Sequence, residues 1–125
     1  MFKGAATNCT FTSNRAKWGG AKHSTNDPTI NCTFISNYAS DYAGALYGNN
    51  AINCTFTDNS ANNTGGAIQG AMNVLNCNFT NCYANVSGGA INGVETVVNC
   101  SFNDCHALAE HGGAIYMDRA GGLVD

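Results

Sequence analysis

Seven cysteines and three histidines are the residues of this chain best suited to chemistry. Thiolates and imidazoles act as nucleophiles or bind metal ions when the fold brings them together. The densest cluster is Asp104-Cys105-His106, with His111 nearby. Neighbouring residues of a strand point to opposite faces, so this run alone forms neither a metal site nor a Cys–His pair. We expect surface histidines here, and we predict no catalytic residue, no metal site and no cofactor.

Acidic residues are equally uninformative about catalysis. Glycan-cleaving enzymes use a pair of carboxylates on one face. This chain has eight Asp and Glu residues in total, and no position of its sequence pattern carries an acid repeatedly. We therefore predict that the protein is not an enzyme.

Five of the cysteines recur in a repeated phrase, Asn-Cys-(Thr/Ser/Asn)-Phe. It begins at residues 8, 31, 53, 76 and 99, in steps of 23, 22, 23 and 23 residues. A second phrase, Gly/Ala-Gly-Ala followed by an aliphatic residue, keeps the same spacing from residues 19, 43, 65, 88 and 112, with Lys22 replacing the aliphatic residue in the first copy. A fixed period in the twenties is typical of a solenoid.

Apolar and polar residues alternate around each cysteine, as in Ile30-Asn31-Cys32-Thr33-Phe34. This period of two indicates a strand with one buried face. No helical period is present, and the four leucines are too few for leucine-rich repeats. We predict an all-β, right-handed, single-stranded parallel β-helix of about five coils of roughly 22–24 residues, each with about three strands, as a single domain over residues 1–125.

Stacked coils place equivalent residues above one another. The repeated cysteines are expected to form a column of reduced thiols in the core: Cys9, Cys32, Cys54, Cys77 and Cys100. An asparagine ladder is expected in a turn, from Asn14, Asn37 and Asn59. Cys82 and Cys105 replace asparagine at the ladder position, and a disulfide between them and two free thiols both remain open.

Polar rows are expected on the outer surface, built from Asn31, Thr33, Asn53, Thr55, Asn76, Asn78, Asn99 and Ser101. Such rows suit a repetitive ligand such as a glycan, or an ice surface. They also suit a strand face that binds nothing, because Thr and Asn are well tolerated there. Among the glycosylation sequons, Asn62 and Asn85 are the best candidates because they precede the glycine turns.

Charge and hydropathy exclude several partners. The net charge is −3 with five Lys and Arg residues, so we expect no nucleic-acid binding. No run of about 18 apolar residues is present, so we expect no membrane insertion by this segment. Neither end carries a capping repeat, from which we expect a segment of a longer array or a unit that joins other copies end to end.

The pairing of Phe-x-x-Asn (Phe34 to Asn37) with Gly-Gly-Ala-Ile (Gly65 to Ile68) resembles the repeats of the chlamydial polymorphic outer-membrane proteins. The fuller form, Asn-Cys-Thr-Phe-Thr followed by Gly-Gly-Ala-Ile-Tyr, is similar to adhesin-like surface proteins of methanogenic archaea. The resemblance implies a cell-surface or extracellular location and supplies no catalytic residues.

We therefore predict a non-catalytic, adhesin-like segment that acts as a rigid stalk or adhesion surface. Its expected partners are surface glycans, another cell or further copies of itself. The alternative is a structural subunit that assembles end to end into filaments.

Overall fold

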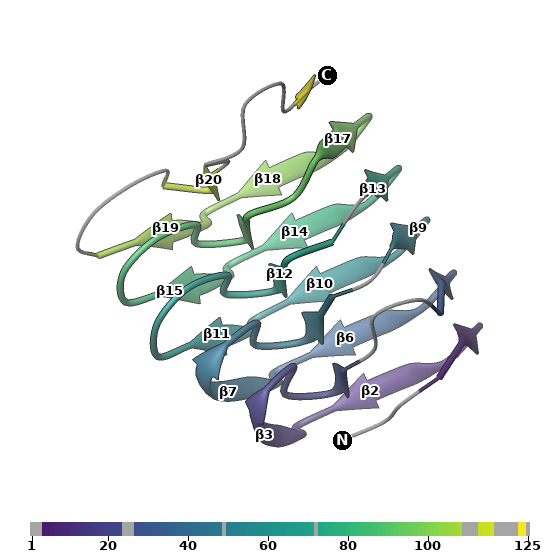
Figure 1. Ribbon diagram of the computed structural model, residues 1–125, viewed down its shortest axis with the longest axis horizontal. Coiled ribbons are helices and arrows are strands. Elements are labelled where there is room, and N and C mark those ends of the chain that lie inside the picture. Colours follow the sequence, from purple (N-terminus) through teal and green to yellow (C-terminus); the bar gives the residue numbers. More distant parts are fainter. Residues whose placement is uncertain are drawn as a thin grey trace.

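The computed structural model describes residues 4–23, 27–48, 50–71, 73–108, 113–116 and 123–124, and these residues form strands and turns without any helix. The chain winds as a parallel β-solenoid of about four turns (Figure 1). This confirms the predicted all-β parallel solenoid, with slightly fewer turns than the five expected. Three of its four sheets contain five strands, which are separated by four steps of about 4.8 Å.

Each coil contributes four short strands, so the predicted three strands per coil is wrong. In the first sheet the strands are β1 (Ala6–Thr7), β5 (Thr29–Ile30), β9 (Ala51–Ile52), β13 (Asn73–Leu75), β17 (Thr96–Val98) and β21 (Leu123–Val124). In the second they are β2 (Thr10–Thr12), β6 (Thr33–Ile35), β10 (Thr55–Thr57), β14 (Asn78–Thr80) and β18 (Ser101–Asn103).

The third and fourth sheets close each coil. The third contains β3 (Arg15–Trp18), β7 (Tyr38–Tyr42), β11 (Ser60–Ala61), β15 (Tyr83–Ala84) and β19 (His106–Ala107). The fourth contains β4 (Lys22–His23), β8 (Leu46–Tyr47), β12 (Ile68–Gln69), β16 (Ile91–Asn92) and β20 (Ile115–Tyr116).

Left-handed backbone corners create the additional strand. Two residues in each coil have φ between 53° and 57°, and all are Asn, Asp or Ser: Asn8, Ser13, Asn31, Ser36, Asn53, Asp58, Asn76, Asn81, Asn99 and Asp104. Asn and Asp tolerate this conformation better than most side chains. Asn31 therefore ends β5 and turns the chain into β6, where the alternating pattern predicted one continuous strand.

The corner also changes which residues face inward. The sequence predicts Ile30, Cys32 and Phe34 on one buried face. Cys32 and Phe34 are buried, but the buried residue of β5 is Thr29, and Ile30 is half-buried. In the later coils, too, the residue two positions before the corner asparagine is buried and the residue directly before it is half-buried. The left-handed corner residue interrupts the alternation of inward and outward side chains, so the strand before the corner does not continue the pattern of the strand after it.

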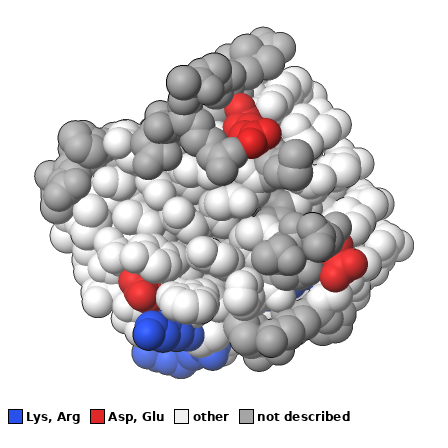
Figure 2. Space-filling model, in the orientation of Figure 1, with Lys and Arg blue, Asp and Glu red and all other residues white. Residues whose placement is uncertain are grey.

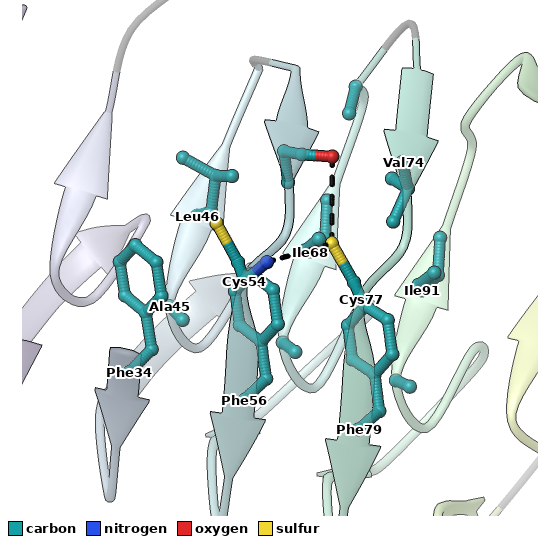
Figure 3. Close-up of a cluster of buried hydrophobic side chains, with 14 of the residues drawn as sticks. Phe34, Ala45, Leu46, Cys54, Phe56, Ile68, Val74, Cys77, Phe79 and Ile91 are labelled. Carbon is teal, nitrogen blue, oxygen red and sulfur yellow. Dashed lines mark hydrogen bonds between the residues drawn. The ribbon is translucent and has the colours of Figure 1, made fainter. Parts of the chain in front are cut away.

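The core is built from vertical columns of identical or similar side chains. The rings of Phe34, Phe56 and Phe79 stack with centroids 4.8 Å apart and nearly parallel planes (Figure 3). Leu46, Ile68 and Ile91 form a second column from the fourth sheet, and all six side chains are fully buried. Parallel strands in register place these rings one above another, and the spacing of their centroids lies in the range of stacked aromatic pairs.

Lys22 occupies the position of that aliphatic column in the first coil and is also fully buried. Its ammonium donates a hydrogen bond to the backbone carbonyl of Asp27 at 3.4 Å. Burial lowers the pKa of Lys22, and the nearby Asp27 carboxylate only partly offsets that effect.

Candidate functional site

The predicted polar rows occupy two different structural settings. Asn31, Asn53, Asn76 and Asn99 are exposed at the left-handed corners, not on a strand face. Asn99 donates a side-chain hydrogen bond to the amide oxygen of Asn76 at 2.7 Å. The corner therefore separates these asparagines from the threonines of the predicted polar rows.

The second row lies on the outer face of the second sheet. Thr33, Thr55, Asn78 and Ser101 are paired in register along β6, β10, β14 and β18. Thr33 and Thr55 are half-buried and the other two are exposed. The Ser101 hydroxyl donates to the Asn78 side-chain oxygen at 2.6 Å, so part of the row's hydrogen-bonding capacity is used between coils.

The three ladder asparagines form a continuous hydrogen-bonded chain. The Asn37 side-chain oxygen accepts hydrogen bonds from the backbone and side-chain N–H groups of Asn14, at 2.9 and 3.0 Å. The Asn59 oxygen accepts the same pair from Asn37, at the same distances. The Asn59 side-chain amide donates to the carbonyl of Phe34 at 3.0 Å. The ladder thus satisfies backbone groups at the second corner, which is a structural role.

Cys82 and Cys105 continue this ladder as free thiols. Cys82 is buried and donates to the carbonyl of Phe56 at 3.6 Å, as Asn59 does to Phe34. A hydrogen bond between the two thiol groups raises the pKa of Cys82 and lowers the pKa of Cys105 to about 7. Cys105 is therefore the more readily ionised member, and the disulfide between them stays a prediction.

The repeated cysteines form a column directly after the first corner, between the first and second sheets, with different degrees of burial. Cys32, Cys54 and Cys77 are buried, Cys100 is half-buried, and Cys9 is exposed, which departs from the predicted core position. Each thiol donates at 3.3 Å to the carbonyl two residues before it. Figure 3 also shows the Cys54 backbone N–H pointing to the Cys77 sulfur, at 3.5 Å. All seven cysteines are free.

The cluster that suggested metal chemistry is spread by the backbone. Asp104 is a left-handed corner residue, and His106 packs edge-on against the ring of Tyr83, with centroids 5.0 Å apart. His111 lies outside the described residues. Among those that are described, no group of three or more His, Cys, Asp or Glu side chains could hold a metal ion.

The two candidate glycosylation positions lie next to each other on the surface. Asn62 is exposed and Asn85 is half-buried, in adjacent coils. The Asn85 side-chain amide donates to the Asn62 oxygen at 2.6 Å. Both asparagines directly follow strands of the third sheet, in turns that lead to the glycines.

One group of side chains was not predicted from the sequence. Trp18, His23, Tyr42 and Tyr47 gather around the turns Gly19-Gly20-Ala21 and Ala43-Gly44-Ala45 of the first two coils. Trp18 is the single tryptophan of the chain and is 40% exposed. The sequence does contain a signal for this cluster: in each of the first two coils, an aromatic residue stands just before the glycine turn and another just after it.

The fold and these surfaces define a β-solenoid of repeated coils, in which many polar side chains form hydrogen bonds with the equivalent side chains of the next coil. Residues 53–71 match a family model described as the Chlamydia polymorphic membrane protein repeat, so this coil is similar to that repeat. No curated protein matches the chain, and no solved structure matches it. In the part of the chain that is described, no helix is long and apolar enough to cross a membrane.

Proposed function

We propose that this chain is a non-catalytic repeat segment of a cell-surface or extracellular adhesin-like protein, acting as a rigid support or adhesion surface. The match of residues 53–71 to a membrane-protein repeat supports this proposal. The same arrangement recurs in the neighbouring coils, because their strands pair with those of the matched coil in register.

The observation that carries the proposal is the vertical repetition of the columns. Phe34, Phe56 and Phe79 overlie one another, and the asparagine ladder does the same one corner later. Coils therefore repeat nearly the same backbone and core at a spacing of about 4.8 Å. A surface of this kind works through shape and repetition, and adding coils extends it without changing it.

Adhesion is tested by coupling the chain to beads and measuring their retention under flow on surfaces coated with mucin or with bacterial polysaccharide. We expect retention above that of beads carrying albumin. A Thr33→Glu/Asn78→Glu variant changes the row on the second sheet, and a Ser40→Glu/Asn62→Glu variant is the matched control at exposed positions elsewhere. Retention equal to albumin on every surface contradicts the adhesion role and leaves a supporting role alone.

A second candidate is end-to-end assembly into filaments. β2 and β18 are the outermost strands of the second sheet as described, and an outer strand presents backbone groups on which another strand can pair. Copies that join in this way form open filaments when the head-to-tail contact does not close into a ring. Light scattering at increasing protein concentration, with negative-stain images, tests this. Rods that lengthen with concentration support assembly, and a constant monomer mass excludes it.

A further inference from the structure

The aromatic cluster lies where two columns of side chains meet across the Gly-Gly-Ala turn. The first column, which precedes the turn, is Trp18, Tyr42, Thr64 and Ser87. The second, which follows it, is His23, Tyr47, Gln69, Asn92 and Tyr116. Both columns are aromatic in the first two coils and polar in the third.

The turn itself does not require aromatic residues. In the third coil the Thr64 hydroxyl donates to the Gln69 side-chain oxygen at 2.7 Å, and Asn92 of the next coil donates to the same oxygen at 2.8 Å. The same backbone turn is therefore stabilised by polar side chains alone. Aromatic residues in the first two coils need another explanation.

The four rings pack against one another in one cluster, which we call the aromatic platform (Trp18, His23, Tyr42 and Tyr47). Trp18 is exposed, and the other three side chains are half-buried. The rings of Trp18 and Tyr47 are 6.0 Å apart with planes inclined by 23°, and Tyr42 lies 6.5 Å from Tyr47. His23 packs edge-on against Tyr47 at 4.9 Å. These spacings are those of rings in contact, so no cation fits between them as in an aromatic cage. A ligand must lie across the platform.

The indole of Trp18 is held in place by hydrogen bonds. Its N–H donates to the Asp41 carboxylate at 3.2 Å, and Asn63 donates to the other carboxylate oxygen at 3.2 Å. A shift of register between Ala16 and Trp18 in the pairing of β3 with β7 brings Trp18 beside Tyr42. The platform is therefore built before a ligand arrives, which lowers the entropic cost of binding.

Positive charge lies beside the platform. Of the three described Lys and Arg residues, Lys22 is buried and the other two, Arg15 and Lys17, are exposed on β3. The Lys17 ammonium is 5.4 Å from the Trp18 ring centre, and the Arg15 guanidinium is 4.6 Å from that of Tyr38. Figure 2 shows these basic side chains gathered at the edge where β3 lies in Figure 1, beside an acidic side chain.

We propose that the aromatic platform binds a pyranose that carries a carboxylate, such as a uronic or sialic acid of a glycan. The apolar C–H face of the sugar would pack on Trp18 and Tyr47, whose rings offer rigid area at little entropic cost. Lys17 and Arg15 would pair with the carboxylate. Two cations outweigh the Asp41 carboxylate, whose oxygens already accept hydrogen bonds from Trp18 and Asn63.

This inference deepens the proposed function, because it names a ligand class for an adhesion surface. It also places the expected glycan-binding site on the aromatic platform of the first two coils, and not on the Asn and Thr rows. The row variants described above leave the platform unchanged, so the two experiments can fail separately.

The test uses the fluorescence of Trp18, the only tryptophan in the chain. The whole chain is titrated with 3′-sialyllactose and with trigalacturonic acid, with lactose and maltotriose as neutral probes. We expect a saturable change with one or both acidic probes, and affinity at least about tenfold weaker for the neutral ones. Binding should weaken as salt is raised, since exposed charges are screened.

Variants assign the signal to the platform. Tyr47→Ala should weaken acidic-probe binding roughly tenfold, while Tyr83→Ala, which removes a similar ring that packs on His106 in a distant coil, should leave it unchanged. Lys17 is exposed, so Lys17→Gln should leave the fold intact, and it should reduce the preference for acidic over neutral probes. Circular dichroism checks that each variant is folded.

Three outcomes overturn the proposal. They are the absence of saturable binding up to tens of millimolar probe, equal affinity for neutral and acidic probes, and equal losses in Tyr47→Ala and Tyr83→Ala. A fluorescence change that follows protein concentration and disappears in Tyr47→Ala would assign the platform to contacts between copies of this chain instead.

Discussion

Lys22 has the same place in its coil as Leu46, Ile68 and Ile91 have in theirs, and it is buried as completely. Burial holds its pKa below the ordinary 10.5. Between the lowered pKa and 10.5 the unfolded chain therefore binds more protons than the folded chain, and the free energy of unfolding rises with pH across that window. At neutral pH the buried charge costs stability.

Replacing this charge with the column's own residue type is the corresponding prediction. Lys22→Leu should raise the free energy of unfolding by about 2 kcal/mol at pH 7. The advantage over the wild type should shrink as pH approaches 10.5. Urea unfolding from pH 7 to 10 measures the difference in the free energy of unfolding between the variant and the wild type. Both proteins carry the same cysteines, so the titration of the cysteines largely cancels in this difference. A variant less stable than the wild type at pH 7 would show that the contact with Asp27 outweighs desolvation.

Gly66 makes a second prediction at this scale. A Cβ added there would overlap the carbonyl oxygen of Gly89 and would lie 2.5 Å from backbone atoms of Tyr83. Backbone atoms of the adjacent coil cannot rotate away, so Gly66→Ala should cost about 3 kcal/mol or more. Gly70→Ala is the control, because φ is +73° there but nothing lies within 4 Å, and it should cost about 1 kcal/mol. If chemical denaturation shows equal losses of unfolding free energy for the two variants, the close approach of Gly66 to the backbone of the next coil is not what requires glycine there.

At the scale of the element, the asparagine ladder fixes the corner between the second and third sheets. Asn59→Ala removes an oxygen that accepts two hydrogen bonds from Asn37 and an amide that donates to Phe34. These buried groups would lose their partners, and we expect a loss of about 3 kcal/mol. Asn59→Cys should cost less, because Cys82 fills the same position in the next coil and reaches the equivalent carbonyl. Thermal unfolding compares the two, and equal losses would count against the ladder.

The strands illustrate which features a sequence pattern can predict. The period and the columns of Phe34, Phe56 and Phe79 follow from the repeat, because parallel coils must stack equal positions. The number of strands does not follow from alternation alone, since a left-handed Asn31 ends one strand and shifts the pattern of the next. The corners still leave a signal, namely Asn, Asp or Ser before each inward Cys or ladder residue.

The candidate site was harder to predict. Trp18 and Tyr47 are 29 residues apart and lie in different sheets. Their contact depends on the turn geometry and on the register shift between β3 and β7. Neither can be inferred from a pattern that averages over all coils, because the platform is an exception to the repeat.

For the whole molecule, stability should depend on how many neighbours a coil has. Phe56 is fully buried between the rings of Phe34 and Phe79, whereas Phe102 is half-buried and stacks on Phe79 alone among the described residues. In a solenoid each coil contacts only the coils next to it, so its stability is a sum of local and nearest-neighbour contributions. Removing a ring between two neighbours breaks two of these interfaces.

We therefore expect Phe56→Ala to cost about 4 kcal/mol and Phe102→Ala roughly half as much. Native-state hydrogen exchange should show the amides of β18 and β19 opening at lower free energy than those of β10 and β11. In Phe102→Ala that difference should widen, because the last coils separate more easily while the central coils keep both interfaces. Equal costs for the two substitutions, together with uniform exchange, would mean that the coils unfold as one cooperative unit. The nearest-neighbour description would then fail for a stack of this length.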